Sequence, residues 1–163
     1  MVITNEHIWA LLEQVPDPEV PVLSVVDLGV VRDVAVTGPD AVTITITPTY
    51  SGCPAMDMIS MNIRMALLEA GIKDIRIESR LSPAWTTDWM SDEGKRKLKE
   101  YGIAPPVNPS GPDGLFQSRE QVPCPHCNST HTELISQFGS TSCKALYRCL
   151  DCKEPFDYFK CHR

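Results

Sequence analysis

The C-terminal part of the chain contains CPHC at residues 124–127 and CLDC at residues 149–152, two Cys-x-x-Cys pairs separated by 21 residues. Two residues between cysteines let one tight turn direct both sulfurs at a single ion, and two such turns complete a tetrahedron. The spacing is typical of a four-thiolate zinc site. The predicted metal ligands are therefore Cys124, Cys127, Cys149 and Cys152.

The sequence around these pairs has the composition of short strands, which we expect at residues 132–138, 145–148 and 156–160. Asn128 tolerates a left-handed backbone and follows the first pair, as such a turn requires. The pattern predicts a zinc ribbon. A module of about 45 residues has little core, so the metal should contribute roughly 10 kcal/mol or more to folding. Structural zinc is the predicted occupant, with a mononuclear iron or an iron–sulfur cluster as alternatives.

Two further cysteines of this region, Cys143 and Cys161, have no place in the four-ligand shell. They are either small buried residues in a module short of apolar side chains, or a second thiol pair that accepts iron or a cluster or forms a disulfide. His126, His131 and His162 are expected to be exposed polar residues, because four cysteines already complete a zinc shell.

Proline and glycine are concentrated between residues 104 and 118, which predicts an interdomain linker. Residues 1–103 would then form a first domain and residues 119–163 the ribbon. In the first domain, the pattern of apolar residues predicts helices at 5–15 and 55–69, and strands at 30–37, 42–46 and 72–80. The charge order after Ser91, with acidic residues first and basic residues after them, suits a helix dipole and predicts a short helix at 92–100. The residues at 38–40 predict a hairpin turn. The fold class is therefore α+β, a small helix and sheet layer followed by the ribbon.

The predicted helix at 55–69 carries two kinds of apolar residue. Isoleucine and leucine occur at four-residue spacing, and four methionines occupy other positions (Ile59, Ile63 and Leu67; Met56, Met58, Met61 and Met65). We expect both stripes to be buried, one on the sheet and the other in the core or on a partner chain.

The only cysteine of the first domain is Cys53, in SGCP at residues 51–54. It lies between a predicted strand and the start of a helix, where backbone N–H groups and the helix dipole favour the thiolate. The alternative is a buried structural cysteine. No local motif pairs Cys53 with a histidine, and the chain has no phosphate-binding glycine loop and no di-iron motif. The sequence therefore predicts a protein that is not an enzyme.

The charge is unevenly distributed along the chain. Residues 1–118 carry nine Lys and Arg against sixteen Asp and Glu, and residues 119–163 carry six against five. An acidic first domain argues against nucleic-acid binding. No apolar run approaches the roughly 20 residues that span a bilayer, and the first residues do not form a signal peptide. We therefore expect a cytoplasmic protein with no membrane partner, whose cysteines stay reduced.

Residues 1 to about 100 resemble the iron–sulfur cluster assembly protein family, through DPE at 17–19, DLGVV at 27–31 and SGCP at 51–54. The ribbon, PTYSGCP at 48–54 and FGSTSCKA at 138–145 extend the resemblance. With them the whole chain is similar to the D-subunit family of the bacterial phenylacetyl-CoA epoxidase systems.

This resemblance implies a role in aerobic phenylacetate degradation, as a factor that assists maturation of the multicomponent epoxidase rather than performing the epoxidation. It implies that Cys53 transiently handles iron or an iron–sulfur cluster. Our hypothesis adds Cys143 and Cys161 as further thiols that hold the same cargo. Asp27 would support this site, or would only stabilise its own turn. The expected partners are the oxygenase or reductase components. The alternative is a stoichiometric structural or electron-transfer subunit with redox-active iron in the four-cysteine site.

Overall fold

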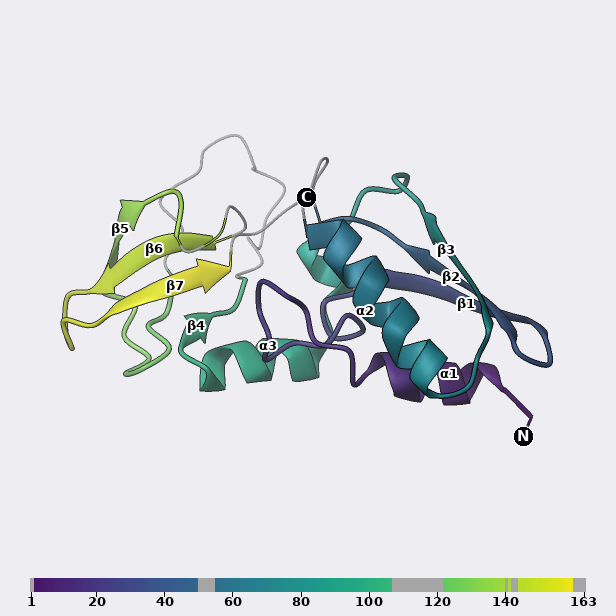
Figure 1. Cartoon of the computed structure of the whole chain (residues 1–163). Coiled ribbons are helices and arrows are strands. Elements are labelled where there is room, and N and C mark those ends of the chain that lie inside the picture. The colour runs from purple at the N-terminus through teal and green to yellow at the C-terminus, as the bar shows by residue number, and fades with distance from the viewer. Residues whose placement is uncertain (1, 50–54, 107–121, 140, 142–143, 160–163) are drawn as a thin grey trace. The chain divides into compact units, whose positions relative to one another are not determined.

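The computed structural model describes residues 2–49, 55–106, 122–139, 141 and 144–159 (Figure 1). The chain forms two compact units, one comprising residues up to Gly94 and the other beginning at Lys95. The limits predicted from the sequence, 1–103 and 119–163, stay a prediction. No helix in the described part of the chain is both long and apolar enough to cross a bilayer.

The first unit contains a three-stranded sheet in the order β1-β2-β3. Strands β1 (Val31–Gly38) and β2 (Ala41–Ile46) form an antiparallel hairpin, and β3 (Asp74–Ser79) pairs with β2 in parallel. The alternating residues Val42, Ile44 and Ile46 are buried as expected. The predicted hairpin is therefore confirmed, and the parallel pairing requires the crossover that the second helix provides.

Two helices contact this sheet: α1 (Asn5–Leu12) contacts β1, and α2 (Ala55–Glu69) contacts β3 (Figure 1). Thr4 caps the start of helix α1, and its hydroxyl accepts a hydrogen bond of 3.2 Å from the His7 backbone N–H. It ends three residues before the predicted end, and the chain continues in a turn toward Pro16. A proline disfavours helical backbone at the residue before it, so Val15 cannot belong to the helix.

Helix α2 buries one stripe only within its own unit. Ile59, Ile63 and Leu67 are at most 2% exposed, whereas Met58, Met61 and Met65 are 51 to 59% exposed. The expectation that the methionine stripe packs in the core is therefore wrong, and its packing on a partner chain stays a prediction. A helix that lies on one face of a sheet has one side to bury, and residues at four-residue spacing occupy that side.

After β3, the segment 85–91 packs against the turn at residues 27–29. The Trp85 indole N–H donates to the Leu28 carbonyl at 2.9 Å, and the Ser91 N–H donates to the Asp27 carbonyl at 2.9 Å. Gly29 has a φ of +77°, and a Cβ on it would lie 2.4 Å from the Trp89 carbonyl oxygen. Only glycine fits this position, because both the backbone conformation and the close approach exclude a side chain. Part of this segment is a 3₁₀ helix (Thr87–Trp89).

Helix α3 (Asp92–Glu100) has the predicted bounds, and Gly102 ends it with a φ of +90°. The second unit contains a four-stranded sheet in the order β4-β7-β6-β5. Its strands are β4 (Ile103–Ala104), β5 (Thr132–Ser136), β6 (Lys144–Cys149) and β7 (Pro155–Phe159). The three ribbon strands lie within two residues of their predicted bounds and pair antiparallel, and β4 pairs with β7 in parallel. Strand β4 was not predicted, because two residues carry no periodicity.

Aromatic side chains, two cysteines and small aliphatic residues form the core of the second unit. Tyr147 stacks on Phe156 with ring centroids 5.9 Å apart, and meets Tyr158 edge-on at 5.4 Å. Cys124 and Cys149 belong to the same buried cluster. Two of the four sulfur ligands predicted from the sequence therefore lie inside this core.

Candidate metal centre

Each Cys-x-x-Cys pair lies in a tight turn. We call residues 124–128 the first knuckle and residues 149–153 the second knuckle. The Asn128 N–H donates to the Cys124 carbonyl at 2.8 Å, and Asn128 has a φ of +63°. Lys153, at the equivalent position of the second knuckle, has a φ of +68°. The left-handed conformation was predicted for Asn128 but not for Lys153, which has no preference for it and adopts it because the turn requires it.

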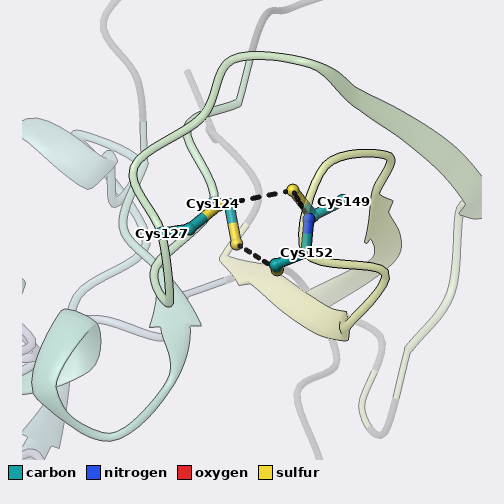
Figure 2. Close-up of side chains that lie close together, drawn as sticks. All are labelled: Cys124, Cys127, Cys149 and Cys152. Atoms are coloured by element: carbon teal, nitrogen blue, oxygen red, sulfur yellow. Dashed lines mark hydrogen bonds between the residues drawn. The ribbon is translucent and has the colours of Figure 1, made fainter.

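The two knuckles bring the four sulfurs together (Figure 2). The sulfur of Cys124 lies 3.8 Å from that of Cys152, and the Cys127 and Cys149 sulfurs are 3.5 Å apart. All four sulfurs lie within 4.8 Å of one another. A zinc–sulfur distance of about 2.3 Å implies a tetrahedral edge of about 3.8 Å. The sulfurs therefore fit one tetrahedral ion.

Backbone N–H groups point at two of the sulfurs. His126 donates to the Cys124 sulfur at 3.4 Å, and Cys152 donates to the Cys149 sulfur at 3.5 Å. Such donors stabilise thiolates, the form that binds metals. The Cys152 N–H is accordingly the main reason why the pKa of Cys149 is lowered to about 7.

The pKa values of two other thiols are raised. Against the lowering effect of the Glu154 backbone, burial and the neighbouring thiols raise the pKa of Cys152 to about 12. Against the lowering effect of the Ser129 backbone, the Cys149 thiol and burial raise the pKa of Cys127. Several thiolates in one small volume repel each other, whereas a bound divalent cation deprotonates its thiol ligands. The arrangement therefore favours a cation.

The cysteines differ in exposure: Cys124 and Cys149 are buried, Cys152 is half-buried and Cys127 is exposed. Four protein sulfurs complete a tetrahedral shell and leave no position for a substrate, which is characteristic of structural metal sites. The residues therefore fit a resident structural ion.

Three polar residues beside the sulfurs had no role in the sequence analysis. The Ser129 hydroxyl donates to one oxygen of the Asp151 carboxylate, and His131 Nδ1 lies 3.2 Å from the other. The Ser129 hydroxyl, and after it His131, lower the pKa of Asp151. We call these three residues the bridge. Only the convergence of the knuckles reveals it, since Ser129 and His131 follow the first and Asp151 lies within the second.

In the first unit, the carboxylate of Asp27 is buried and accepts hydrogen bonds from the Ser24 N–H at 3.2 Å and the Ser91 hydroxyl at 3.1 Å. The Ser91 hydroxyl also accepts from the Gly94 N–H at 2.9 Å, at the start of α3. These bonds match the alternative in which Asp27 stabilises its own turn. A supporting role toward Cys53 stays a prediction, because Cys53, Cys143 and Cys161 lie outside the described residues.

Comparison with known proteins identifies a family for each part of the chain. Residues 5–78 match the family described as iron-sulfur cluster assembly protein, and residues 108–160 match the PaaD zinc beta ribbon domain. A protein of Escherichia coli strain K12, provisionally named as the D-subunit of 1,2-phenylacetyl-CoA epoxidase, is 54% identical over 95% of this chain and 92% of its own length. The metal-binding character of the ribbon therefore rests on both its family and its four sulfurs.

Further relatives share the first part of this arrangement. An Fe-S protein maturation auxiliary factor of Porphyromonas gingivalis is 40% identical over 58% of this chain and 90% of its own length. A solved domain of unknown function from Bacillus anthracis is 30% identical with a TM-score of 0.54, and covers 57% of this chain and 89% of its own. A conserved hypothetical protein of Thermotoga maritima is 31% identical with a TM-score of 0.51, over 60% and 95% of the two chains. These structures confirm the predicted α+β fold.

Proposed function

Because the chain belongs to the family that joins an iron–sulfur cluster assembly domain to a PaaD zinc beta ribbon, we propose that it is a non-catalytic maturation factor for the phenylacetyl-CoA epoxidase. The name of the Escherichia coli relative supports the link to the epoxidase. The names of three shorter relatives, all Fe-S protein maturation auxiliary factors, support a role in iron–sulfur assembly.

The four-cysteine site holds structural zinc in this proposal. The single observation that carries it is the convergence of four sulfurs within 4.8 Å, at the spacing of one tetrahedral ion. A four-iron cluster would bind each cysteine through a different iron atom, which requires a wider separation of the sulfurs. The ion would organise the ribbon, and the ribbon would dock on the oxygenase or reductase component.

The cargo is handled elsewhere in this proposal. Cys53 transiently binds iron or a cluster, together with Cys143 and Cys161, and Asp27 supports the surrounding loop. The support is the match of SGCP at residues 51–54 to the assembly family, and the position of Cys53 just before α2, which favours a thiolate. The target would be an apo component of the epoxidase.

The test is to express the oxygenase and reductase components with and without this chain, and to purify each anaerobically. We expect components made without it to contain less iron and sulfide and to turn over more slowly. Cys53→Ser should reproduce this loss, whereas Glu69→Ala, an exposed substitution at the end of α2 and outside the methionine stripe, should behave as the wild type. Components that are fully loaded and active without the chain would contradict the proposal.

The alternative function is a stoichiometric structural or electron-transfer subunit. The observation that favours it is the same set of sulfurs, because tetrahedral four-sulfur sites also suit iron. Metal analysis of the purified chain separates the two. A colourless zinc protein excludes electron transfer at this site, whereas bound iron with visible absorption and reversible reduction would replace the maturation proposal.

A further inference from the structure

The bridge connects the two knuckles without passing through the sulfurs. Ser129 and His131 lie just beyond the first knuckle, and Asp151 lies between the two cysteines of the second. Because the ionised carboxylate can only accept, the Ser129 hydroxyl and His131 Nδ1 must be the donors. Asp151 therefore receives hydrogen bonds from two residues of the other half of the site.

Backbone hydrogen bonds hold the bridge in register. The His131 N–H donates to the Ser129 hydroxyl at 3.1 Å, which leaves the hydroxyl hydrogen free to point at Asp151. The Cys124 N–H donates to the Ser129 carbonyl at 2.8 Å, and the Leu150 N–H donates to the His131 carbonyl at 2.8 Å. A continuous hydrogen-bonded path therefore runs from the backbone of one ligand, Cys124, to the residue beside another, Cys152.

A metal ion leaves a four-sulfur site only after some sulfurs have moved away from the others. Cys127 and Cys152 are the less buried ligands, one from each knuckle, whereas Cys124 and Cys149 are fixed in the core. Asp151 directly precedes Cys152, so outward movement of this part of the second knuckle must stretch or break its bonds to Ser129 and His131. The bridge opposes the motion that release requires.

We propose that the bridge of Ser129, His131 and Asp151 acts as a latch: it keeps the two knuckles closed and sets the rate at which the four-cysteine site releases its metal. The three are positioning residues, since none is among the four sulfur ligands. The inference rests on the metal site of the proposed function and adds a control on metal exchange. The side chains of His131 and Asp151 are 66% and 55% exposed, so the latch affects release much more than overall stability.

The test measures metal release from the full-length, zinc-loaded chain mixed with excess chromogenic chelator. We expect Asp151→Ala to release zinc about three to ten times faster than the wild type. Removal of a residue bonded directly to a metal ligand typically lowers metal affinity by about 10- to 100-fold, and Asp151 is one step further from the ion. Ser129→Ala should act in the same direction, and Ser129→Thr, which keeps the hydroxyl, should restore slow release.

A matched control is available in the same sheet. Glu133 pairs with Arg148 across β5 and β6, is also partly exposed, and carries the same charge as Asp151. Glu133→Ala removes that charge and an ion pair without touching the latch, so its release rate should equal that of the wild type. Equal release rates for Asp151→Ala and Glu133→Ala would overturn the latch.

A mutant cycle with three substitutions tests the mechanism. If Asp151 acts through its two donors, then Asp151→Ala should have little further effect in a chain that already carries Ser129→Ala and His131→Ala. Fully additive effects would overturn the latch while leaving the metal site intact. A purified chain with no ion bound by its four cysteines would overturn the site and the latch together, whereas normal epoxidase maturation without this chain would leave both standing.

Discussion

The two units of the chain differ in the residues that form their cores. The first buries aliphatic side chains between α1, α2 and a three-stranded sheet, with Ile8, Leu12, Ile44 and Ile63 fully covered. The second places aromatic rings and two cysteines in its buried cluster. Apolar burial stabilises the first unit. In the second, two of the predicted metal ligands, Cys124 and Cys149, are part of the buried cluster, so we expect its folding to be coupled to the ion.

Metal removal should produce the largest difference in stability between the two units. Binding of a structural zinc contributes roughly 10 kcal/mol or more, so a chelator should unfold the second unit and leave the first folded. Amide hydrogen exchange follows the folding of both units. The Tyr147 amide in β6 should lose its protection from exchange, and the Ile44 amide in β2 should keep it. Added zinc should restore protection at Tyr147. Persistent protection of β6 in metal-free protein would show that the aromatic core is enough to keep the second unit folded without the metal.

The next largest effect should come from the core of the first unit. Ile63→Ala leaves a cavity under α2 and should lower the free energy of unfolding by about 2 to 5 kcal/mol. Met61→Ala, on the exposed side of the same helix, should change it by less than about 0.5 kcal/mol. All three tryptophans, at positions 9, 85 and 89, precede the boundary at Gly94, so tryptophan fluorescence in urea reports on this unit alone. Similar losses for both variants would contradict the one-sided burial of α2.

Gly29→Ala should destabilise the first unit by about 2 to 3 kcal/mol, because it combines a left-handed backbone with a clash against the Trp89 carbonyl. Gly71 provides the control. Its φ is +93°, but a Cβ there would meet nothing within 4 Å. Gly71→Ala should therefore cost only the left-handed backbone strain, about 1 to 2 kcal/mol. Equal urea midpoints for the two variants in the same fluorescence titration would show that segment 85–91 can move to accommodate the added methyl group at little cost.

The smallest expected effect is on the start of α3. Ser91→Ala removes a hydroxyl that accepts from Gly94 and donates to Asp27, and should cost about 1 to 2 kcal/mol. Thr4→Ala removes the cap of α1, which has a single exposed bond, and should cost about 0.5 to 1 kcal/mol. The comparison uses thermal unfolding monitored by tryptophan fluorescence. A larger loss for Thr4→Ala would show that the bond between Ser91 and Asp27 contributes nothing.

Local patterns were enough to predict most of the elements. Alternating residues such as Val42 and Ile44 specified the hairpin, and the charge order of residues 92–100 specified α3. The burial of α2 within its own unit was overestimated, since hydrophobicity alone does not show which side of a helix meets a sheet. A two-residue strand such as β4 exists only because β7 offers a free edge, which no local pattern can reveal.

The sequence by itself determined that four cysteines would meet, because the Cys-x-x-Cys spacing dictates a turn that aims two sulfurs at one point. It also determined, through Asn128, where one of those turns would need a left-handed residue. Only the tertiary structure decided that Ser129, His131 and Asp151 meet beside the sulfurs, and that Asp27 bonds to Ser91. These contacts join residues 20 or more positions apart, and their formation depends on the packing of whole elements rather than on the preferences of neighbouring residues.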